Sequence, residues 1–405
     1  MRELLKNRNA LVIWISTSLS RFGDCFENIA LMYLINSLTR SALAMGTVMI
    51  FSMIPNLILS PFAGVIADRY NVKKIMFISE IIRAVAILAI PILYYTGYIK
   101  VWHIYAISVI VSSAESFFGP ASNIAIVHGV QKDLLPVMNS VITACNHIMR
   151  TIGYSLAGVL MVVVNIEILF VFDSITFFIS AIAAMILILP KSEVIKIEKI
   201  KDIGSDMKIG LDYLIKEKYI LILIVTMMIL SFIVAPIGNF IPITVDKVFK
   251  LKPVWGGILL TTFSVGSFCG CILYPILNKM KFKLKLYYLI SFPTMGLAIL
   301  ISTMMPSIYT AVAAYFIIGI LVSIANMWMS TEFQQKCNPS YIGRVSAVLS
   351  MLMLCVDPFA SGFFGYIIDR IAMYKIYIAV GICTMILGCI LYKKIEGKVI
   401  KKDVV

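Results

Sequence analysis

The chain has 405 residues, of which 60% are hydrophobic and only 14% are charged, and its mean hydropathy is +0.96. A water-soluble protein of this length could not remove so much apolar surface from water. The net charge of +14 would suit a nucleic-acid partner, but the distribution of Lys and Arg described below has another explanation, and we expect no nucleic-acid binding. The composition therefore indicates an integral membrane protein.

Long apolar runs repeat along the whole chain. A helix needs about 20 apolar residues to cross a bilayer, and twelve runs approach or exceed this length. They cover residues 10–36, 43–67, 75–96, 101–128, 137–164, 167–189, 220–245, 254–278, 284–305, 307–330, 342–368 and 373–392. The sequence predicts an all-α integral membrane protein with twelve transmembrane helices.

A polar stretch divides these runs into two sets of six. It predicts a cytoplasmic linker over residues 191–219, between an N-terminal six-helix bundle over 1–190 and a C-terminal six-helix bundle over 220–405. Four apolar residues of the linker fall near one helical face: Ile203, Met207, Leu211 and Leu214. This spacing predicts an amphipathic helix on the membrane surface. Sparse matches between the two halves favour a parallel internal repeat.

The Lys and Arg residues follow this topology. With the N-terminus placed in the cytoplasm, 25 of the 35 fall in cytoplasmic segments, seven in outside loops and three within helices. Cytoplasmic loops of membrane proteins carry such an excess of positive charge. We therefore expect a multi-pass protein of the plasma membrane, in contact with the lipid bilayer, with both termini in the cytoplasm.

The first predicted helix carries charged residues in its middle. Arg21, Asp24 and Glu27 are spaced three residues apart, which places them near one side of a helix. Ionisable groups are costly inside a membrane, so they are expected to face one another or a water-filled cavity. We assign them to substrate binding or proton coupling, because Glu27 has no evident partner within the helix. The alternative is a structural ion pair between Arg21 and Asp24.

A short charged turn joins the second and third runs. It contains Gly64, Asp68, Arg69, Lys73 and Lys74. Gly64 is expected to allow close approach of a neighbouring helix, while Asp68 and Arg69 end one helix and Lys73 and Lys74 begin the next. The family resemblance described below favours a gating role for this turn. The alternative is ordinary anchoring of basic residues at the membrane surface.

Further ionisable residues lie near the middle of later helices. Glu115 and Arg150 are each about fourteen residues into their helices, so both are expected near the membrane midplane, paired with each other. Asn146 precedes Arg150 by one helical turn, and Asp357 lies near the middle of the eleventh helix. Buried carboxyls of this kind can take up and release protons. We assign these residues to substrate binding or proton coupling, with Asp173 of the sixth helix as a further carboxyl of the same set.

Two other pairs are given structural roles. Glu80 and Arg83 are three residues apart in the third helix, and we expect them to form an ion pair near its cytoplasmic end. Gly266 and Gly270 form a small-xxx-small pattern, which predicts close packing of the eighth helix against a neighbour.

The charged turn resembles the pattern G-x-x-x-D-R-x-G-R/K-R/K of the major facilitator superfamily of transporters. Asn71 stands at the second Gly, and Asn tolerates the left-handed conformation; Val72 replaces a basic residue. In that family the acid of the turn, here Asp68, engages the N-terminus of the eleventh helix and holds the two halves closed on the cytoplasmic side. The helix dipole favours a carboxylate there. The resemblance implies the major facilitator fold of two six-helix bundles.

Other stretches resemble the macrolide-efflux and enterobactin-exporter branch of this superfamily. They are RFGDCFENIAL from Arg21, PASN from Pro120, RTIGYSLAG from Arg150, GLDYL from Gly210, GRV from Gly343 and GYIIDR from Gly365. The branch usually reads R-x-x-G-P in the fifth helix, where Tyr154 here takes the place of Pro. The resemblance implies export of amphipathic molecules from the cytoplasm, driven by proton entry.

Several functions fit this sequence to different degrees. The leading interpretation is a monomeric drug:proton antiporter that exports macrolide-like drugs or lipophilic natural products by alternating access. The alternative is a dedicated exporter of a siderophore or peptide, in which Arg21 and Arg150 hold an anionic ligand. A nutrient importer or a non-transporting membrane partner is less favoured, because scaffolds rarely keep midplane charges. No enzyme motif, metal site or cofactor is indicated.

Overall fold

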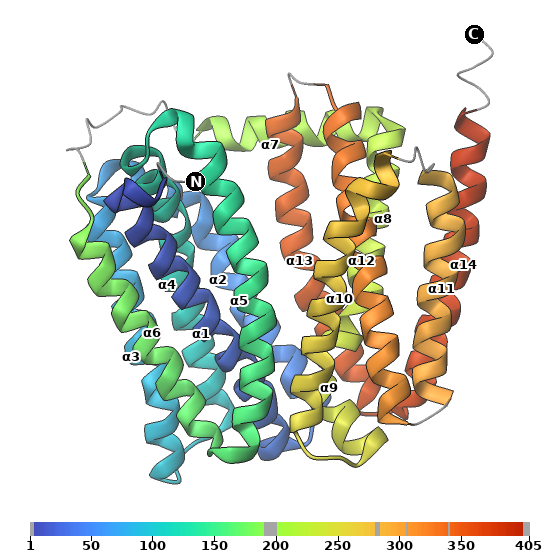
Figure 1. Ribbon diagram of the computed structural model, residues 1–405, viewed down its shortest axis with the longest axis horizontal. Coiled ribbons are helices and arrows are strands. Elements are labelled where there is room, and N and C mark those ends of the chain that lie inside the picture. Colours follow the sequence, from blue (N-terminus) through green and yellow to red (C-terminus); the bar gives the residue numbers. More distant parts are fainter. Residues whose placement is uncertain (1–3, 190–200, 280–283, 305–306, 339–340, 400–405) are drawn as a thin grey trace. The chain divides into compact units, whose positions relative to one another are not determined.

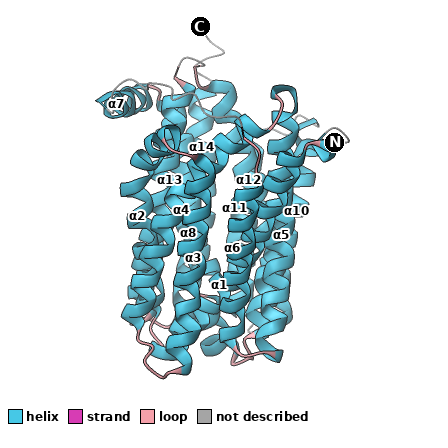
Figure 2. Ribbon diagram, turned by 90° about the vertical axis from the view of Figure 1, so that its left-hand side faces the viewer, coloured by secondary structure: helices cyan, strands magenta, loops and turns pink. Residues whose placement is uncertain are grey.

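Helices account for the secondary structure throughout the described part of the chain. The computed structural model describes residues 4–189, 201–279, 284–304, 307–338 and 341–399. Among these residues there is no strand, and long helices run beside one another with loops at their ends (Figure 1, Figure 2). The long helices are α1 Arg8–Thr39, α2 Ala42–Arg69, α3 Val72–Tyr95, α4 Val101–Gly129, α5 Leu135–Val163, α6 Ile166–Ile186, α8 Lys218–Asn239, α10 Val254–Lys279, α11 Leu284–Met304, α12 Ile308–Lys336, α13 Ile342–Ile368 and α14 Met373–Val399.

The helix predicted over 220–245 is interrupted. After α8 the chain forms the short α9, Ile241–Ile243, and then the π-helical η3, Thr244–Phe249. Pro242 lies at the start of α9, and its lack of a backbone N–H suits a helix start better than a helix interior. The break lies directly after Asn239, a residue of the candidate site described below.

Asparagine side chains begin two of the helices of the N-terminal half. Asn7 Oδ1 accepts a hydrogen bond from the backbone N–H of Ala10 at 3.1 Å, at the start of α1. Asn71 Oδ1 accepts from the backbone N–H groups of Lys73 and Lys74, at 3.0 and 3.3 Å, at the start of α3. Asn71 does not use the left-handed conformation that Asn tolerates. Its φ of −65° and ψ of 109° are those of an N-cap residue in extended backbone.

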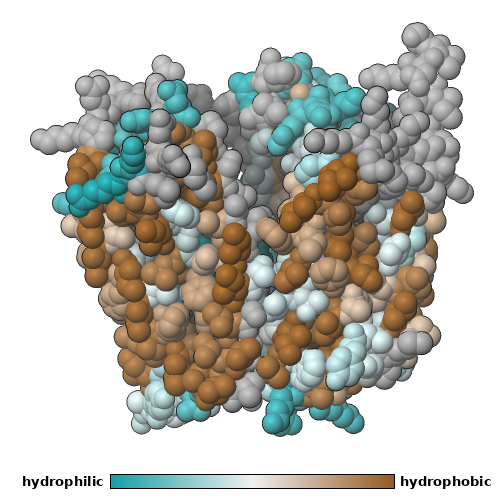
Figure 3. Space-filling view, viewed as in Figure 1, coloured by the Kyte–Doolittle hydropathy of each residue, from teal (hydrophilic) through white to brown (hydrophobic). Residues whose placement is uncertain are grey.

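The surfaces of the helices are suited to a lipid environment. Among the described residues, nine helices contain a stretch long and apolar enough to cross a membrane. The predicted number of twelve is therefore met only in part by this measure; α1, which carries Arg21, Asp24 and Glu27 in its middle, is one that falls short. Brown apolar side chains cover the visible face of each unit between hydrophilic ends (Figure 3).

Two compact units make up the structure. The first contains Met1–Asp202 with Ser361–Gly365, and the second contains Ile203–Ala360 with Tyr366–Val405. In the first, α3 packs with α4 and α6, and α2 with α4; in the second, α11 packs with α12 and α14, and α10 with α12. This recurrence agrees with an internal repeat. The boundaries at 190 and 219 stay a prediction, and residues 190–200 lie outside the described part.

Close packing of α10 on α12 depends on glycine. A Cβ added to Gly270 would lie 2.6 Å from the backbone oxygen of Ile320, and one added to Gly266 would overlap the backbone oxygen of Phe316. Gly319 of α12 makes the reciprocal contact with the backbone of Phe263. These contacts confirm the predicted packing role of Gly266 and Gly270.

The linker helix α7, Lys201–Lys216, packs against the second unit, crosswise to α12 and α13 (Figure 1). A Cβ added to Gly210 would lie 2.9 Å from the backbone oxygen of Arg344 in α13. The Tyr213 hydroxyl accepts a hydrogen bond from the backbone N–H of Asn338 at 3.1 Å, just after α12. Leu214 completes the contact inside an apolar cluster of the second unit.

The face expected of this helix differs from the one observed. Leu214 is 1% exposed whereas Leu211, placed on the same face by the sequence, is 48% exposed. The difference arises because Gly210, Tyr213 and Leu214 turn toward the protein. The side chains of Ile203 and Met207 lie outside the described residues, and contact of α7 with a membrane surface stays a prediction.

Candidate functional site

A buried guanidinium group lies at the centre of a charged network in the first unit. Arg83 of α3 is paired with Asp24 of α1, with its Nη2 atom 2.8 Å from Asp24 Oδ1. Its Nη1 atom is 3.7 Å from Glu80 Oε1, and its guanidinium carbon lies 3.9 Å from the centre of the Phe177 ring of α6. The Arg83 side chain is 4% exposed. Three helices therefore hold one cation in an apolar interior.

The network continues toward solvent through Arg21. The Arg21 Nη1 atom is 3.1 Å from Asp24 Oδ2 and 3.3 Å from Glu115 Oε1 of α4. The Arg21 side chain is 45% exposed and that of Glu115 is 34% exposed. Charges thus alternate from Arg83 through Asp24 and Arg21 to Glu115, and both outer members of this series are more exposed than Arg83 and Asp24. Such a chain can receive a polar ligand at one end and transmit a charge change to the buried end.

The prediction that Glu115 pairs with Arg150 is wrong. Among the described residues the Glu115 carboxylate pairs with Arg21, and Arg150 of α5 lies with its guanidinium carbon 5.9 Å from the centre of the Tyr154 ring. Equal depth along two helices does not fix which way each side chain points, and α4 presents Glu115 to α1. The structural alternative for α1, an Arg21–Asp24 pair, is formed, but it is part of the larger network.

Helix α5 lies against the same part of α1. A Cβ added to Gly153 would lie 2.8 Å from Cys25 Cβ, so the absence of a side chain permits this approach. Arg150 is exposed, whereas Asn146 is half-buried with its Oδ1 atom buried and without a hydrogen-bond partner. These α5 residues lie beside the network without joining its chain of ion pairs.

Glu27 is placed against a second buried acid of the first unit. The carboxyl groups of Glu27 and Asp173 interact with each other across the contact of α1 with α6. Asp173 of α6 is 0% exposed and packs on the backbone of α1 at Gly23, where a Cβ would overlap Asp173 Oδ1 and Thr176 Oγ1. The acid that lacked a partner in the sequence of the first helix therefore faces another helix.

The second unit contributes a simpler polar contact. Asn239 Nδ2 at the end of α8 donates a hydrogen bond to Asp357 Oδ1 of α13 at 3.0 Å. No Lys or Arg lies within hydrogen-bonding distance of Asp357 among the described ion pairs. The residues expected in one site thus fall into two sets, with Arg21, Asp24, Glu27, Glu115, Asn146 and Arg150 in the first unit and Asp357 in the second.

The charged turn joins α2 to α3 as predicted, but its glycine behaves differently. A Cβ added to Gly64 meets no atom within 4 Å. The expected close approach to another helix is therefore not found within its unit, because Ala63 and Ala67 form the buried side of α2. The remaining members, Asp68, Arg69, Lys73 and Lys74, lie at the adjoining ends of α2 and α3.

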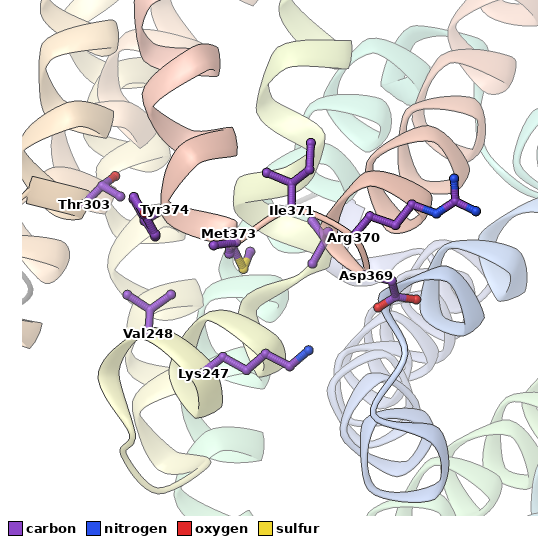
Figure 4. A pocket seen from close by; sticks show the side chains of 10 residues that line it. Lys247, Val248, Thr303, Asp369, Arg370, Ile371, Met373 and Tyr374 are labelled. Atoms are coloured by element: carbon purple, nitrogen blue, oxygen red, sulfur yellow. The ribbon is translucent and has the colours of Figure 1, made fainter.

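A pocket of about 510 Å³ opens at the end of the second unit where η3 and the turn between α13 and α14 lie (Figure 4). It is lined by Lys247 and Val248 of η3, Thr303 of α11 and the turn 368–374 between α13 and α14. Its lining includes Ile368, Asp369 and Arg370 of the GYIIDR stretch but none of the residues predicted to bind substrate or couple protons. We therefore assign the candidate site to the charged network.

Arg83 and Glu80 are network residues whose role the sequence analysis missed. Their spacing correctly predicted a pair, but nothing in the sequence placed Arg83 beside Asp24, 59 residues away. A usable signal was available, since both residues are charged within an otherwise apolar helix, as Asp24 is in α1.

Known proteins resemble this chain along most of its length. The profile of the Major Facilitator Superfamily matches residues 13–356. Macrolide efflux protein A of Streptococcus pyogenes is 23% identical over 367 residues, which cover 89% of each chain. The staphyloferrin A transporter of Staphylococcus aureus is 25% identical over 400 residues, 93% of this chain and 94% of that protein.

Solved structures share the fold at lower identity. The nucleoside transporter NupG superposes with a TM-score of 0.76 at 14% identity, covering 96% of this chain and 98% of that one. A bacterial homologue of the human lysosomal transporter Spinster, in an inward-facing and occupied conformation, gives a TM-score of 0.70 at 13% identity, with 95% of each chain covered. These likenesses agree with the all-helical architecture described above.

Proposed function

Because the chain belongs to the major facilitator superfamily, we propose that it is a secondary active exporter that moves hydrophobic or amphipathic small molecules out of the cytoplasm by proton antiport. The chain is a multi-pass membrane transporter and not an enzyme. The proposal concerns its direction, its ligands and its driving ion. The observation that carries it is the charged network of Arg83, Asp24, Arg21 and Glu115 in the first unit.

The cost of these charges supports a transport role. Ionisable groups within membrane-spanning helices are expensive and are kept where they serve a function. In this network a buried cation, Arg83, is connected through alternating charges to a partly exposed acid, Glu115. A proton that binds to a carboxyl group in or beside this network changes the charge balance around Arg21, so proton binding and ligand binding at Arg21 can influence each other. That mutual influence is what coupled transport requires.

The direction of transport is proposed from the relatives and from the charge distribution. Macrolide efflux protein A is named for efflux, and the excess of Lys and Arg in alternate loops supports cytoplasmic termini in the plasma membrane. The turn with Gly64, Asp68, Arg69, Lys73 and Lys74 would then face the cytoplasm. We propose that Asp68 closes that side by engaging the N-terminus of α13, as the resemblance of the turn implies.

Transport by the purified protein tests the proposal. Proteoliposomes with an internal pH dye and an imposed proton gradient would be given erythromycin, ethidium or an iron-free carboxylate siderophore in turn. We expect ligand-dependent proton movement with erythromycin or ethidium, and its loss in Asp24→Asn and Glu115→Gln. Ligand movement without proton movement, in correctly inserted protein, would contradict the antiport part of the proposal.

A dedicated siderophore exporter is the second candidate function. Arg21 and Arg150 of the first unit are both exposed, and guanidinium groups bind carboxylates with high geometric specificity. The relative that is a staphyloferrin A transporter also favours this candidate. Proton movement dependent on the siderophore alone, and lost in Arg150→Gln, would favour it over drug export.

A further inference from the structure

The first unit holds more acids than cations in the interior of its helices. Apart from the first and last turns of α1 to α6, five carboxyl groups face three guanidinium groups. They are the acids Asp24, Glu27, Glu80, Glu115 and Asp173 and the cations Arg21, Arg83 and Arg150. If all were charged, the carboxylates would exceed the guanidinium groups by two. An uncompensated charge in the buried interior of a protein costs about several kcal/mol, even after the surroundings relax.

Among these five acids, Asp173 has the fewest groups that could stabilise a negative charge. It is 0% exposed, and its Oδ2 atom is buried and receives no hydrogen bond from a donor group. Its Oδ1 atom has only the Thr176 hydroxyl, at 3.4 Å, and no ion pair to a Lys or Arg among the described residues includes it. A buried carboxylate normally has strong hydrogen bonds or a cation as compensation. Asp173 as a charged group has neither.

Its neighbour is another acid. The Asp173 carboxyl of α6 lies against α1 at Gly23, one helical turn before Glu27, and the carboxyl groups of Glu27 and Asp173 interact with each other. An ionised carboxylate has only acceptor atoms, so two of them can form a hydrogen bond only when one carries a proton. A single proton between the two groups therefore supplies the missing donor and removes one of the excess charges.

We propose that Glu27 and Asp173 form a carboxyl pair that binds one proton, and that this is the proton exchanged during transport. The second half of this inference rests on the proposed function, whereas the first half rests on the geometry alone. Glu27 is half-buried and Asp173 fully buried, so the proton enters and leaves through Glu27. The O–H bond at Glu27 breaks when a water molecule accepts the proton, and the pair is left with both groups ionised.

The surroundings explain how this event reaches the ligand site. The charged groups that act on the pair are Asp24 in α1, Arg83 in α3 and Glu115 in α4. Beyond them, Glu80 of α3 pairs with Arg83, and Cys25 of α1 lies between Asp173 and Arg150 of α5. Arg83 is the buried cation among them. Loss of the proton adds a negative charge that attracts Arg83, in competition with Asp24. Weakening of the Arg83–Asp24 pair leaves Asp24 paired with Arg21 alone and frees its Oδ1 atom for a ligand.

Infrared spectroscopy tests the bound proton without any ligand. A protonated carboxyl has a carbonyl band that is separate from the carboxylate bands and shifts in heavy water. In protein reconstituted at neutral pH we expect such a band, which the double variant Glu27→Gln/Asp173→Asn loses. Each single variant should shift or remove it. Glu167→Gln is the matched control, because Glu167 is also a buried acid of α6 but lies in its first turn.

The outcomes separate this inference from the proposed function. A spectrum of the folded double variant identical to that of the wild type would overturn the shared proton; should that variant not fold, unchanged spectra of both single variants would do the same. Absence of the band in the wild type, with heat stabilisation by Na⁺ that the double variant lacks, would assign a sodium site instead. A wild-type band without proton movement during erythromycin transport would leave the proton site standing and refute antiport.

The role of this proton in transport needs a second readout. With erythromycin as the probe, we expect the double variant to exchange internal for external ligand at equilibrium but to lose accumulation driven by a proton gradient. Glu167→Gln should retain both activities. Full proton-driven accumulation by the double variant would show that the exchanged proton binds elsewhere.

Discussion

At the scale of single residues, burial separates the two arginines of the network. Both Arg83 and Arg21 pair with Asp24, but their side chains are 4% and 45% exposed. Removing one partner from a buried pair leaves an uncompensated charge and costs about 3–5 kcal/mol. A solvent-exposed pair contributes about 0–1 kcal/mol because water screens it. We therefore expect Arg83→Gln to lower the thermal unfolding midpoint in detergent far more than Arg21→Gln.

Arg83→Lys provides the control for this comparison. It keeps the positive charge, so it should recover part of the stability that Arg83→Gln loses, but not the contacts of a planar group with Asp24, Glu80 and the Phe177 ring. Equal destabilisation by Arg21→Gln and Arg83→Gln would contradict the picture of a buried centre and an exposed end.

The same residues show what sequence can predict about the candidate site. The Arg21–Asp24 and Glu80–Arg83 contacts follow from helical spacing alone. The contacts between helices do not, because they depend on the rotation of each helix about its axis, and periodicity in mostly apolar helices leaves that rotation open. For this reason Glu115 was expected to pair with Arg150 and instead pairs with Arg21, and Asp173 was not connected with Glu27.

At the scale of helices, we predict that replacing a glycine of α10 at its contact with α12 lowers the stability of the protein. An Ala side chain at Gly266 would overlap the backbone oxygen of Phe316 in α12, and backbone cannot move aside as a flexible side chain can. Overpacking of this kind typically costs about 1–3 kcal/mol. We expect Gly266→Ala to lower the thermal unfolding midpoint. Gly119→Ala in α4 is the matched control, since nothing lies within 4 Å of its added Cβ.

Gly119→Ala should leave stability unchanged or raise it slightly, because Ala is the better helix former. A loss of stability in Gly119→Ala as large as that in Gly266→Ala would show that the effect does not arise from close packing of α10 on α12.

Helix α7 leads to a prediction that a chemical probe can test. Cys337 at the end of α12 is buried in the cluster that contains Leu214. Burial raises the pKa of the Cys337 thiol. Less thiolate is therefore present at a given pH than for a free cysteine, and alkylation, which needs the thiolate, is slow. Leu214→Ala removes an apolar contact worth about 2–5 kcal/mol and should speed alkylation of Cys337 by loosening α7.

Mass spectrometry of the labelled peptide would measure this rate apart from the other cysteines. Because exposure returns the thiol pKa toward its ordinary value, the difference between Leu214→Ala and the wild type should be greatest below the raised pKa and shrink as pH increases. Leu211→Ala is the control, since Leu211 is exposed on the same helix. Equal rates in both variants would show that α7 does not cover Cys337.

At the scale of the whole molecule, the sequence was sufficient to predict the superfamily and the helical architecture. Long apolar runs and a charged turn are one-dimensional signals, and they need no knowledge of packing. The position of the interruption after α8 and the docking of α7 were not predicted, because both depend on contacts between distant segments. The resemblance of the two halves was weak in sequence, yet the same helix pairings recur in both units.

The ionisable residues differ between the two units although the helix pairings recur, and this difference leads to a prediction. The described middle portions of the first unit's helices contain the connected network, whereas Asp357 of the second unit has an amide neighbour, Asn239. If coupling depends on exchange of charge among linked groups, it belongs to the first unit. We expect Asp24→Asn to reduce proton-driven accumulation of erythromycin by about tenfold or more, the scale of a typical coupling free energy.

Asp357→Asn should keep the dependence on the proton gradient and change the ligand concentration needed for half-maximal transport. The comparison is made in the same proteoliposomes, with ligand exchange at equilibrium as a measure of active protein in each variant. Since Asn can still accept a hydrogen bond from Asn239, the variant preserves the polar contact while removing the charge. Loss of gradient dependence in Asp357→Asn as complete as in Asp24→Asn would place coupling in both units, and the repeat would then be functional as well as structural.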